Sequence, residues 1–503
     1  MFAKVNVLQL GQTDLSKEID LNSSVEWLYE DNIEESEIKI YDVVVLTRPI
    51  KEEERYILFK KIRAHCLFVK DDIQMNEPTE WICHSKLARF LNDEQMKSFL
   101  QGLIEDYYSF SYGEKLIPQM LTVKEGFKGN IQWDGFSDLT LSGDFGENFT
   151  QAAFWRYNIP IQTDQSLDFW LEYEKTGSLE ITFKLTQIIN GSLNTIDNEW
   201  IFTEEDLKNV VYVTNDKKDG LIFASIQAKG KGSLKINSLH VRYSRRGKGV
   251  FLPGGIRCVT KKREEVFFYF DPGDMKPPLN VYFSGYKTQE GFEGYYMMKK
   301  LGAPFLLVSD SRLEGGDFYI GDEEYEENVK AGIQHYLNEL GFTSDQLVLS
   351  GLSMGTFGAL YYGCDFQPHS IIVGKPLASL GDIATNERIN RPGGFPTSLD
   401  IVWKESHDLE DESIKKLNDK FWNKFDSVDW KDTKFIVSYM IEDDYDSTAY
   451  QSLLKHIKDD KVEIYSKGLH GRHNDNTSGI VQWFVGRYNY VLNEDFKREF
   501  EDK

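Results

Sequence analysis

The spacing of hydrophobic residues predicts a small α/β domain over residues 1–122. Short apolar runs at 5–10, 43–46 and 66–69 have the length of buried strands. Residues 93–108 instead repeat their apolar positions every three to four residues, as an amphipathic helix does. This mixture of buried strands and helix is typical of an α/β unit.

The pattern changes over residues 123–248, where apolar and polar positions alternate with a period of two. Four such segments, at 167–173, 179–185, 221–226 and 234–241, are separated by Gly, Asn and Asp and by no long helix. Strands joined in this way favour an antiparallel β-sandwich.

Aromatic residues gather at the start of this second zone. We expect them in the core of the sandwich, because aromatic side chains dominate core burial. The alternative is a sugar-stacking platform, like that of a carbohydrate-binding module. The residues concerned are Trp133, Phe136, Phe145, Phe149, Phe154, Trp155 and Tyr157.

The third zone, residues 249–503, follows a basic, glycine-bearing stretch at 244–249 that we interpret as a solvated linker. Apolar runs then alternate with helical segments, which predicts βαβ units and a mostly parallel, doubly wound sheet. An insertion at about 376–433 has the position of a cap on a hydrolase fold. The expected strands are 281–283, 305–308, 346–350, 371–373, 435–440 and 462–465, and the expected helices are 326–340, 356–363 and 448–458.

Composition and charge exclude several classes of protein. The 503 residues are 41% hydrophobic, enough for packed cores, and the formal net charge of −23 repels phosphate backbones, so we expect no nucleic-acid partner. The four cysteines are too few and too scattered for a disulfide framework or a CxxC metal site. No segment approaches the ~20 apolar residues that span a bilayer, and the N-terminus lacks a secretion-signal pattern. We expect a cytoplasmic protein.

The motif Gly-Leu-Ser-Met-Gly at residues 351–355 has the pattern of a nucleophile elbow. Such an elbow places a reactive serine on a sharp turn between a strand and a helix, and its glycines allow close approach of neighbouring chains. The apolar run 346–350 directly before the motif and the helical segment 356–363 directly after it supply that context. We therefore predict an α/β-hydrolase-like domain in which Ser353 is the nucleophile.

A serine nucleophile needs a base, and the base needs an acid that orients it. In this fold the acid follows the nucleophile in the chain and comes just after a late strand. The expected strand 435–440 is followed by an acidic loop, from which we choose Asp443, with Glu442 as the alternative. We expect Asp444 and Asp446 to be solvated.

The base is expected after the next strand, where two histidines share one loop. We prefer His473, because the loop has by then left the strand, and keep His470 as the alternative. A zinc site at these two residues has no third ligand at a known spacing, so we predict no metal. The remaining histidines are expected at surface or packing positions: His65, His84, His240, His335, His369, His407 and His456.

Acyl chemistry also needs backbone N–H groups that stabilise the oxyanion. The residue after the nucleophile, Met354, is one expected donor. The other should lie in the loop after the strand 281–283, where we nominate Gly285 and Tyr286. Residues 391–396 line an acceptor pocket or form a surface loop.

Three motifs together resemble one family. Gly-Leu-Ser-Met-Gly-Thr at 351–356, Tyr-Met-Ile-Glu-Asp-Asp-Tyr-Asp at 439–446 and Gly-Leu-His-Gly-Arg-His-Asn-Asp at 468–475 are similar to those of the accessory secretory protein two family. The resemblance covers essentially the whole chain. Members belong to accessory Sec systems, through which Gram-positive bacteria export serine-rich repeat glycoproteins.

The resemblance implies an O-acetyltransferase that acetylates N-acetylglucosamine on the glycosylated serine-rich repeat adhesin in the cytoplasm. It implies Ser353 as nucleophile and His473 as base; because the acid in the family can be a glutamate, Glu442 stays open beside Asp443. It also implies that the protein assists export together with the other accessory secretory proteins and the accessory Sec motor ATPase, at the periphery of the translocon.

Two other functions use the same residues or fold. A carbohydrate esterase would release the acetyl group to water, and a non-enzymatic export adaptor would keep the fold without the chemistry. An intact order of serine, acid and histidine speaks against the adaptor. No cofactor is expected to be bound permanently; acetyl-CoA is a candidate acetyl donor, although the chain shows no Gly-rich phosphate loop.

Overall fold

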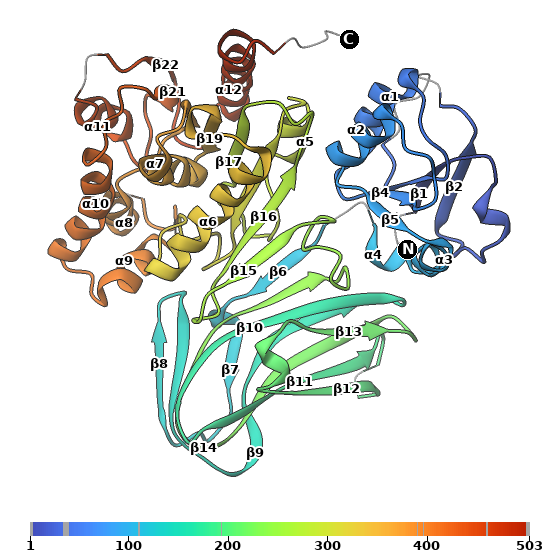
Figure 1. Ribbon diagram of the computed structural model, residues 1–503. Helices are drawn as coiled ribbons and strands as arrows, with labels where there is room; N and C mark the ends of the chain where they lie inside the picture. Colours follow the sequence, from blue (N-terminus) through green and yellow to red (C-terminus); the bar gives the residue numbers. More distant parts are fainter. Residues whose placement is uncertain are drawn as a thin grey trace.

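The structure is a computed structural model that describes residues 4–33, 40–108, 111–192, 194–389, 391–395, 397–458 and 461–498. Residues 1–3 and Pro396, which enter the expectations above, lie outside the described residues. Three bodies are visible in Figure 1: an N-terminal domain, a domain of long β-strands, and a C-terminal α/β domain.

The N-terminal domain is a parallel sheet with the strand order β2-β1-β3-β4-β5. Three of its strands coincide with the predicted apolar runs, whereas β2 and β5 are partly exposed edge strands that the pattern missed. The predicted helix 93–108 is two helices, because Gly102 ends the first. The elements are β1 (Val5–Leu10), β2 (Val25–Glu30), β3 (Val43–Leu46), α1 (Arg55–Lys61), β4 (Leu67–Lys70), α2 (Glu77–Ser85), β5 (Arg89–Leu91), α3 (Asp93–Gln101) and α4 (Leu103–Asp106).

The second domain is one nine-stranded antiparallel sheet that bends back on itself. The two predicted strands at 221–226 and 234–241 are halves of a single strand, β14, which pairs with β11 along its first half and with β10 along its second. The two halves of the sheet share one hydrophobic core, so the domain has the layers of a sandwich without two separate sheets. The strands are β6 (Gly113–Leu116), β7 (Leu121–Val123), β8 (Asn130–Asp134), β9 (Asp138–Ile161), β10 (Gln165–Gly177), β11 (Glu180–Ile189), β12 (Ile196–Thr203), β13 (Val211–Asn215) and β14 (Gly220–Tyr243).

Glycines make the bend possible. Gly230 on β14 has φ 93° and pairs with Gly146 on β9, which has φ 92°. A Cβ on Gly230 would lie 2.3 Å from the carbonyl oxygen of Ser178, whereas a Cβ on Gly146 would meet no atom within 4 Å. Gly230 therefore provides both the left-handed backbone and the space for a neighbouring strand.

The aromatic cluster of this domain divides between core and surface. Trp155 is fully buried and donates its indole N–H to the carbonyl oxygen of Leu116 (3.3 Å). Trp133 and Phe149 are exposed. The core interpretation is right for Trp155 and wrong for the two exposed rings.

The C-terminal domain has an eight-stranded sheet in the order β15-β16-β18-β17-β19-β20-β21-β22. Strand β16 is antiparallel to both neighbours and the other pairs are parallel, which is the expected hydrolase-like arrangement. The pattern missed β15 and β16, which lie next to the expected linker. The strands are β15 (Ile256–Val259), β16 (Glu265–Asp271), β17 (Leu279–Phe283), β18 (Phe305–Asp310), β19 (Leu347–Leu352), β20 (Ser370–Gly374), β21 (Lys434–Met440) and β22 (Ile464–Leu469).

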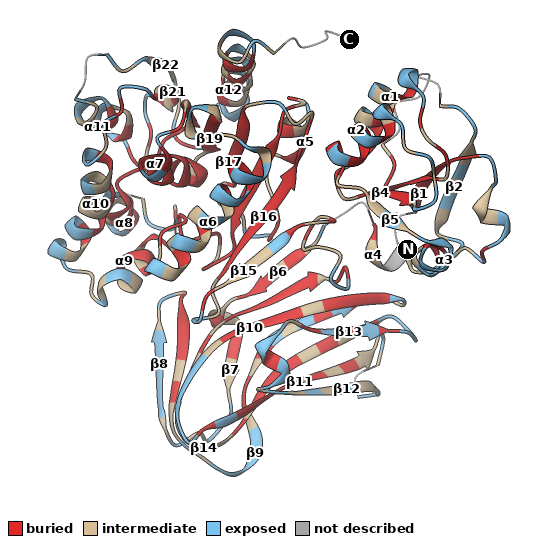
Figure 2. Cartoon of the chain, viewed as in Figure 1, coloured by how far each residue is buried: buried red, intermediate tan, exposed pale blue. Residues whose placement is uncertain are grey.

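Helices cover both faces of this sheet, and its central strands are buried along their length (Figure 2). One face packs against α6, α7 and α10, and the other against α5 and α12. The expected insertion contains α8, α9 and α10. The helices are α5 (Tyr295–Lys299), α6 (Glu323–Leu340), α7 (Met354–Phe366), α8 (Leu380–Ile389), α9 (Ser398–Ser406), α10 (Asp411–Asp426), α11 (Ala449–His456) and α12 (Thr477–Tyr490).

The expected linker is solvated only in part, because Arg246 and Gly247 are exposed and Arg245 is not. Arg245 within it is 1% exposed, and its guanidinium donates to the carbonyl oxygens of Asp106, Tyr108 and Phe251 (3.0–3.1 Å). Its aliphatic stem and planar head therefore sit where all three domains meet. The prediction was wrong for Arg245, because a basic residue can satisfy buried backbone carbonyls, which spacing along the chain does not reveal.

We expect Gly230→Ala to destabilise the protein more than Gly146→Ala. Both substitutions force alanine into a left-handed backbone, at a cost of about 1–2 kcal/mol, but only the first also places a methyl group against Ser178. Urea unfolding of the full chain, followed by tryptophan fluorescence, measures the difference. Equal losses in the two variants would show that close strand approach does not control the bend.

Candidate active site

Ser353 occupies the sharp turn between β19 and α7. Its backbone has φ 52° and ψ −122°, a strained conformation for a residue with a side chain. A Cβ on Gly351 would lie 2.3 Å from the carbonyl oxygen of Gly355, and a Cβ on Gly355 would lie 2.0 Å from that of Phe283. The two glycines of the motif are thus required by close packing, and the turn leaves the Ser353 hydroxyl exposed to a pocket.

His473 lies in the loop after β22 and meets the serine. Its Nε2 is 2.8 Å from Ser353 Oγ, across 120 residues of sequence. The ring is 1% exposed and packs edge-on against Tyr445, with the ring centres 4.5 Å apart. The backbone N–H of His473 donates to Asp444 Oδ1 (3.0 Å), which fixes the loop.

Asp443 lies in the loop after β21 and contacts the other ring nitrogen. Its Oδ2 is 2.8 Å from His473 Nδ1. Its Oδ1 accepts the backbone N–H groups of Tyr445 (2.9 Å) and Asp446 (3.2 Å), and these hydrogen bonds fix the orientation of the carboxylate. A carboxylate bonded to Nδ1 favours the tautomer in which Nε2 accepts the serine proton.

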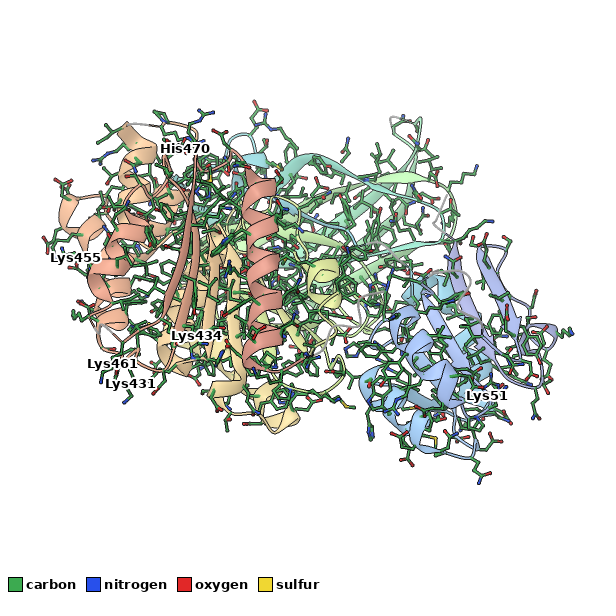
Figure 3. The ribbon with its side chains drawn as sticks, turned by 90° about the horizontal axis from the view of Figure 1, so that it is seen from above. Lys51, Lys431, Lys434, Lys455, Lys461 and His470 are labelled. Atoms are coloured by element: carbon green, nitrogen blue, oxygen red, sulfur yellow. The ribbon has the colours of Figure 1, made fainter. Side chains whose placement is uncertain are left out.

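The alternatives Glu442 and His470 form a separate pair. Glu442 Oε1 is 3.0 Å from His470 Nδ1, and Oε2 accepts the N–H of Gly471. The His470 side chain is 86% exposed, at the molecular surface in Figure 3. The structure brings neither residue to Ser353.

Asp446 is not a solvated residue. It is 3% exposed and accepts the backbone N–H groups of Ala378 (2.9 Å) and Ser379 (2.8 Å), at the start of the cap insertion. Burial raises its pKa to about 6. The acidic loop therefore orients the histidine with one carboxylate and anchors the cap with another.

The expected oxyanion donors are only partly available. The N–H of Gly285 donates to Glu293 Oε2 (2.6 Å), so the nomination of Gly285 is wrong. Met354 and Tyr286 both line the pocket beside Ser353. That their N–H groups stabilise an oxyanion stays a prediction.

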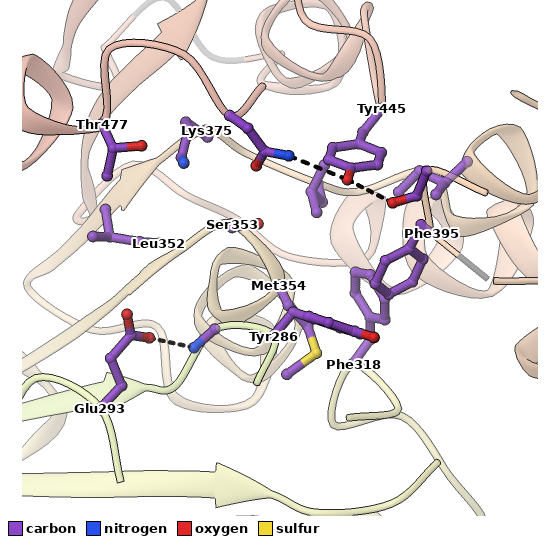
Figure 4. Close-up of a pocket in the computed structure, with 15 residues that line it drawn as sticks. Tyr286, Glu293, Phe318, Leu352, Ser353, Met354, Lys375, Phe395, Tyr445 and Thr477 are labelled. Carbon is purple, nitrogen blue, oxygen red and sulfur yellow. Dashed lines mark hydrogen bonds between the residues drawn. The ribbon is translucent and has the colours of Figure 1, made fainter. Parts of the chain in front are cut away.

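The pocket in front of Ser353 has a volume of about 370 Å³. In Figure 4, Tyr286, Phe318 and Phe395 form one wall, while Glu293 and Lys375 lie on the other side of the serine. Phe395 belongs to the stretch 391–396 that we considered as a pocket wall, and it does line the pocket. An aromatic wall facing polar groups suits a ligand with an apolar face and hydroxyl groups.

Lys375 and Glu293 were missed by sequence reasoning. Lys375 directly follows β20, is 6% exposed and has φ 58°. Burial lowers the pKa of its ammonium group, an effect that the carboxylates of Asp443 and Glu293 oppose. The sequence could have pointed to Lys375, because it is a charged residue at the carboxyl end of an expected parallel strand. No comparable pattern marks Glu293.

Serine after β19, aspartate after β21 and histidine after β22, in this chain order, define a protein of the α/β-hydrolase-like class. The sequence also matches, over residues 5–498, the model of the accessory secretory protein two family, described as accessory Sec system GspB-transporter. The chain belongs to this family. Within the described part of the chain, no helix combines the length and apolarity needed to cross a membrane.

Relatives match over nearly their full length. The chain is 36% identical to the family's accessory Sec system protein from Streptococcus gordonii, over 99% of both chains. It is 37% identical to the accessory Sec system protein of the same family from Staphylococcus aureus (strain NCTC 8325 / PS 47), over 98% of both chains. A solved structure of the Glycosylation Associate Protein (Gap123) complex from Streptococcus agalactiae matches with a TM-score of 0.88 and 36% identity, covering 99% of this chain and 100% of that one.

We expect Asp443→Asn to slow the reaction of Ser353 with a fluorophosphonate probe by about 10³-fold or more, because the amide no longer favours the reactive tautomer of His473. Glu442→Gln is the matched control, since it alters the neighbouring carboxylate that contacts His470 instead. Its labelling rate should stay within about twofold of the unmodified protein. The reverse ranking would assign the acid to Glu442.

Proposed function

We propose that the protein is a serine-dependent O-acetyltransferase that acetylates N-acetylglucosamine on a serine-rich repeat glycoprotein. The observation that carries the proposal is the 2.8 Å contact between Ser353 Oγ and His473 Nε2, with Asp443 behind the imidazole. The S. agalactiae relative is named Glycosylation Associate Protein, which supports the glycoprotein setting, and the aromatic and polar walls of the pocket suit a sugar.

In the first half-reaction, Ser353 Oγ attacks the carbonyl carbon of the acetyl donor while His473 Nε2 takes the hydroxyl proton. The N–H groups of Met354 and Tyr286 stabilise the negative oxygen of the tetrahedral intermediate. The intermediate collapses, the bond to the donor breaks, and His473 returns the proton to the leaving group. Acetyl-Ser353 remains.

In the second half-reaction, His473 removes the proton of a sugar hydroxyl, whose oxygen attacks the acetyl carbonyl. The Ser353–acetyl bond then breaks, the serine regains its proton, and the sugar carries the ester. Transfer exceeds hydrolysis when the bound acceptor is better placed than water, and such placement can be worth ~7–11 kcal/mol. Acetyl-CoA is the donor that we propose to test first.

We further propose that the protein acts together with other accessory secretory proteins during export of the glycoprotein, in the cytoplasm. The S. agalactiae relative is named as part of a complex, which supports such an assembly. The adhesin and the motor ATPase are the partners to test.

We expect Ser353→Ala to abolish acetylation of the co-expressed glycoprotein, measured as the loss of the acetyl mass increments in glycopeptide mass spectra. Unchanged acetylation would remove the catalytic proposal. Thr356→Val is a control that alters a neighbouring hydroxyl, bonded to the Ser353 carbonyl, without removing the nucleophile. Secretion measured in parallel separates the two roles, because lost acetylation with retained export means that they are independent.

The carbohydrate-esterase alternative predicts a different fate for the acetyl group. With acetyl-CoA and the unacetylated glycoprotein, a transferase yields acetylated sugar in excess of free acetate. An esterase instead releases acetate from the acetylated glycoprotein at a rate that Ser353→Ala abolishes. Comparing the two products by mass analysis and enzymatic acetate assay decides between them.

A further inference from the structure

The loop that carries Tyr286 extends beyond the active site. This oxyanion loop, residues 284–294, connects β17 to α5. Tyr286 lies near its beginning, against the pocket, and Glu290 lies near its end. Glu290 is 7% exposed. Although its loop is part of the hydrolase-like domain, Glu290 contacts residues of the β-sheet domain.

Glu290 binds two basic side chains on β14. Its Oε2 accepts the Nε–H of Arg242 at 2.6 Å, and its Oε1 forms a short contact with Nδ1 of His240. Its backbone N–H donates to the carbonyl oxygen of Gly113 on β6 (2.9 Å). Both the main chain and the side chain of the loop are therefore fixed to the neighbouring domain.

The contacts continue into the hydrolase-like sheet. Arg242 donates two N–H groups to Glu265 on β16 (3.0 and 2.6 Å), and Arg257 on β15 donates another (2.8 Å). On the far side of His240, Glu172 on β10 lies 3.2 Å from Nε2. Arg242 thus bridges the oxyanion loop and the sheet with a planar, bidentate contact.

Each carboxylate of this cluster contacts a basic side chain. Burial disfavours the imidazolium form of His240, but Glu290 and Glu172 outweigh burial and raise its pKa to about 9. The cluster thus contains three carboxylates and three cations: Glu172, Glu265 and Glu290, and His240, Arg242 and Arg257. The side-chain N and O atoms of Glu172, His240 and Glu265 lie close enough to one another to hold a metal ion. However, both oxygens of the Glu265 carboxylate already accept N–H groups of Arg242. We favour a charge network over a metal site.

Strand β6 holds a second loop at the same pocket. Lys115 donates its ammonium to the carbonyl oxygen of Leu313, in the loop after β18. Two residues further on, the carbonyl oxygen of Gly315 accepts the backbone N–H of Lys287 (3.2 Å), and a Cβ on Gly315 would collide with the Tyr286 ring. At Gly113, a Cβ would lie 2.7 Å from Cβ of Glu290. Neither Gly113 on β6 nor Gly315 in the second loop has space for an added methyl group.

We propose that Glu290 is a positioning residue through which the β-sheet domain holds the oxyanion loop, so that the Tyr286 N–H stays aimed at the oxygen developing on the acyl-serine. This inference rests on the proposed acyl transfer at Ser353. Its physical basis is that an oxyanion donor is effective only when it is preorganised within a few tenths of an ångström. The β-sheet domain is then part of the catalytic apparatus.

The test uses the full-length protein and the burst of p-nitrophenol released as Ser353 is acetylated by p-nitrophenyl acetate. The burst amplitude measures the fraction of protein molecules with a competent site. The rate constant of the burst at saturating substrate reports how well each competent site stabilises the oxyanion. We expect Glu290→Gln to lower this rate constant at least ~10-fold and to change the apparent substrate affinity less than ~3-fold. A role in folding alone would lower the amplitude and leave the rate constant unchanged, which would overturn the proposal.

Glu174→Gln is the matched control, because Glu174 is a half-exposed carboxylate on β10 that faces Lys235 and lies outside the network. Its amplitude and rate constant should both equal those of the unmodified protein. Gly113→Ala perturbs the same loop from the backbone side and should lower the rate constant too, which keeps the test available if Glu290→Gln folds poorly.

Hydrogen exchange separates this inference from the proposed function. Amides of residues 284–294 should exchange faster in Glu290→Gln and in Gly113→Ala, whether or not Ser353 is acylated. Unchanged exchange would overturn the positioning role. If the unmodified protein gives no burst while exchange responds as expected, the acyl-transfer proposal fails and the anchoring of the loop stands.

Discussion

The left-handed backbone of Ser353 is the constraint on which the site depends. It turns the chain between β19 and α7 so that the hydroxyl leaves the sheet and reaches His473. Such a conformation persists only when the surrounding structure over-determines it. Here the close packing around Gly351 and Gly355 fixes the backbone of the turn, because neither position has space for a side chain.

The same constraint explains why the elbow and its partners could be predicted from sequence. A glycine-flanked serine between an apolar run and a helix is a local pattern, and the order of the strand ends is a property of the fold. Asp443 and His473 follow from that order. What the pattern left open was the choice between the adjacent residues Glu442 and Asp443, since it does not show which way the loop directs each side chain. The structure separates them through contacts with His470 and His473.

Long-range contacts account for what could not be predicted. The N–H of Gly285 is occupied by Glu293, a carboxylate whose proximity depends on how the loop folds back. Arg245 looks like part of a linker in sequence and is buried at the junction of the domains. His240 has no motif around it and belongs to a charge network made from β10, β14, β15, β16 and the oxyanion loop. Strand β14 reads as two strands because its bend requires glycines that resemble a turn.

Residues 113–116 form β6, the first strand of the middle sheet, although the hydrophobic pattern assigned residues 1–122 to the N-terminal domain. The chain therefore cannot be divided by cutting between apparent modules. A fragment beginning at residue 249 would retain Glu265 but lose the guanidinium of Arg242, which would leave a desolvated anion with only Arg257 to neutralise it. The hydrolase-like sheet is therefore completed electrostatically by a guanidinium that comes from the middle sheet.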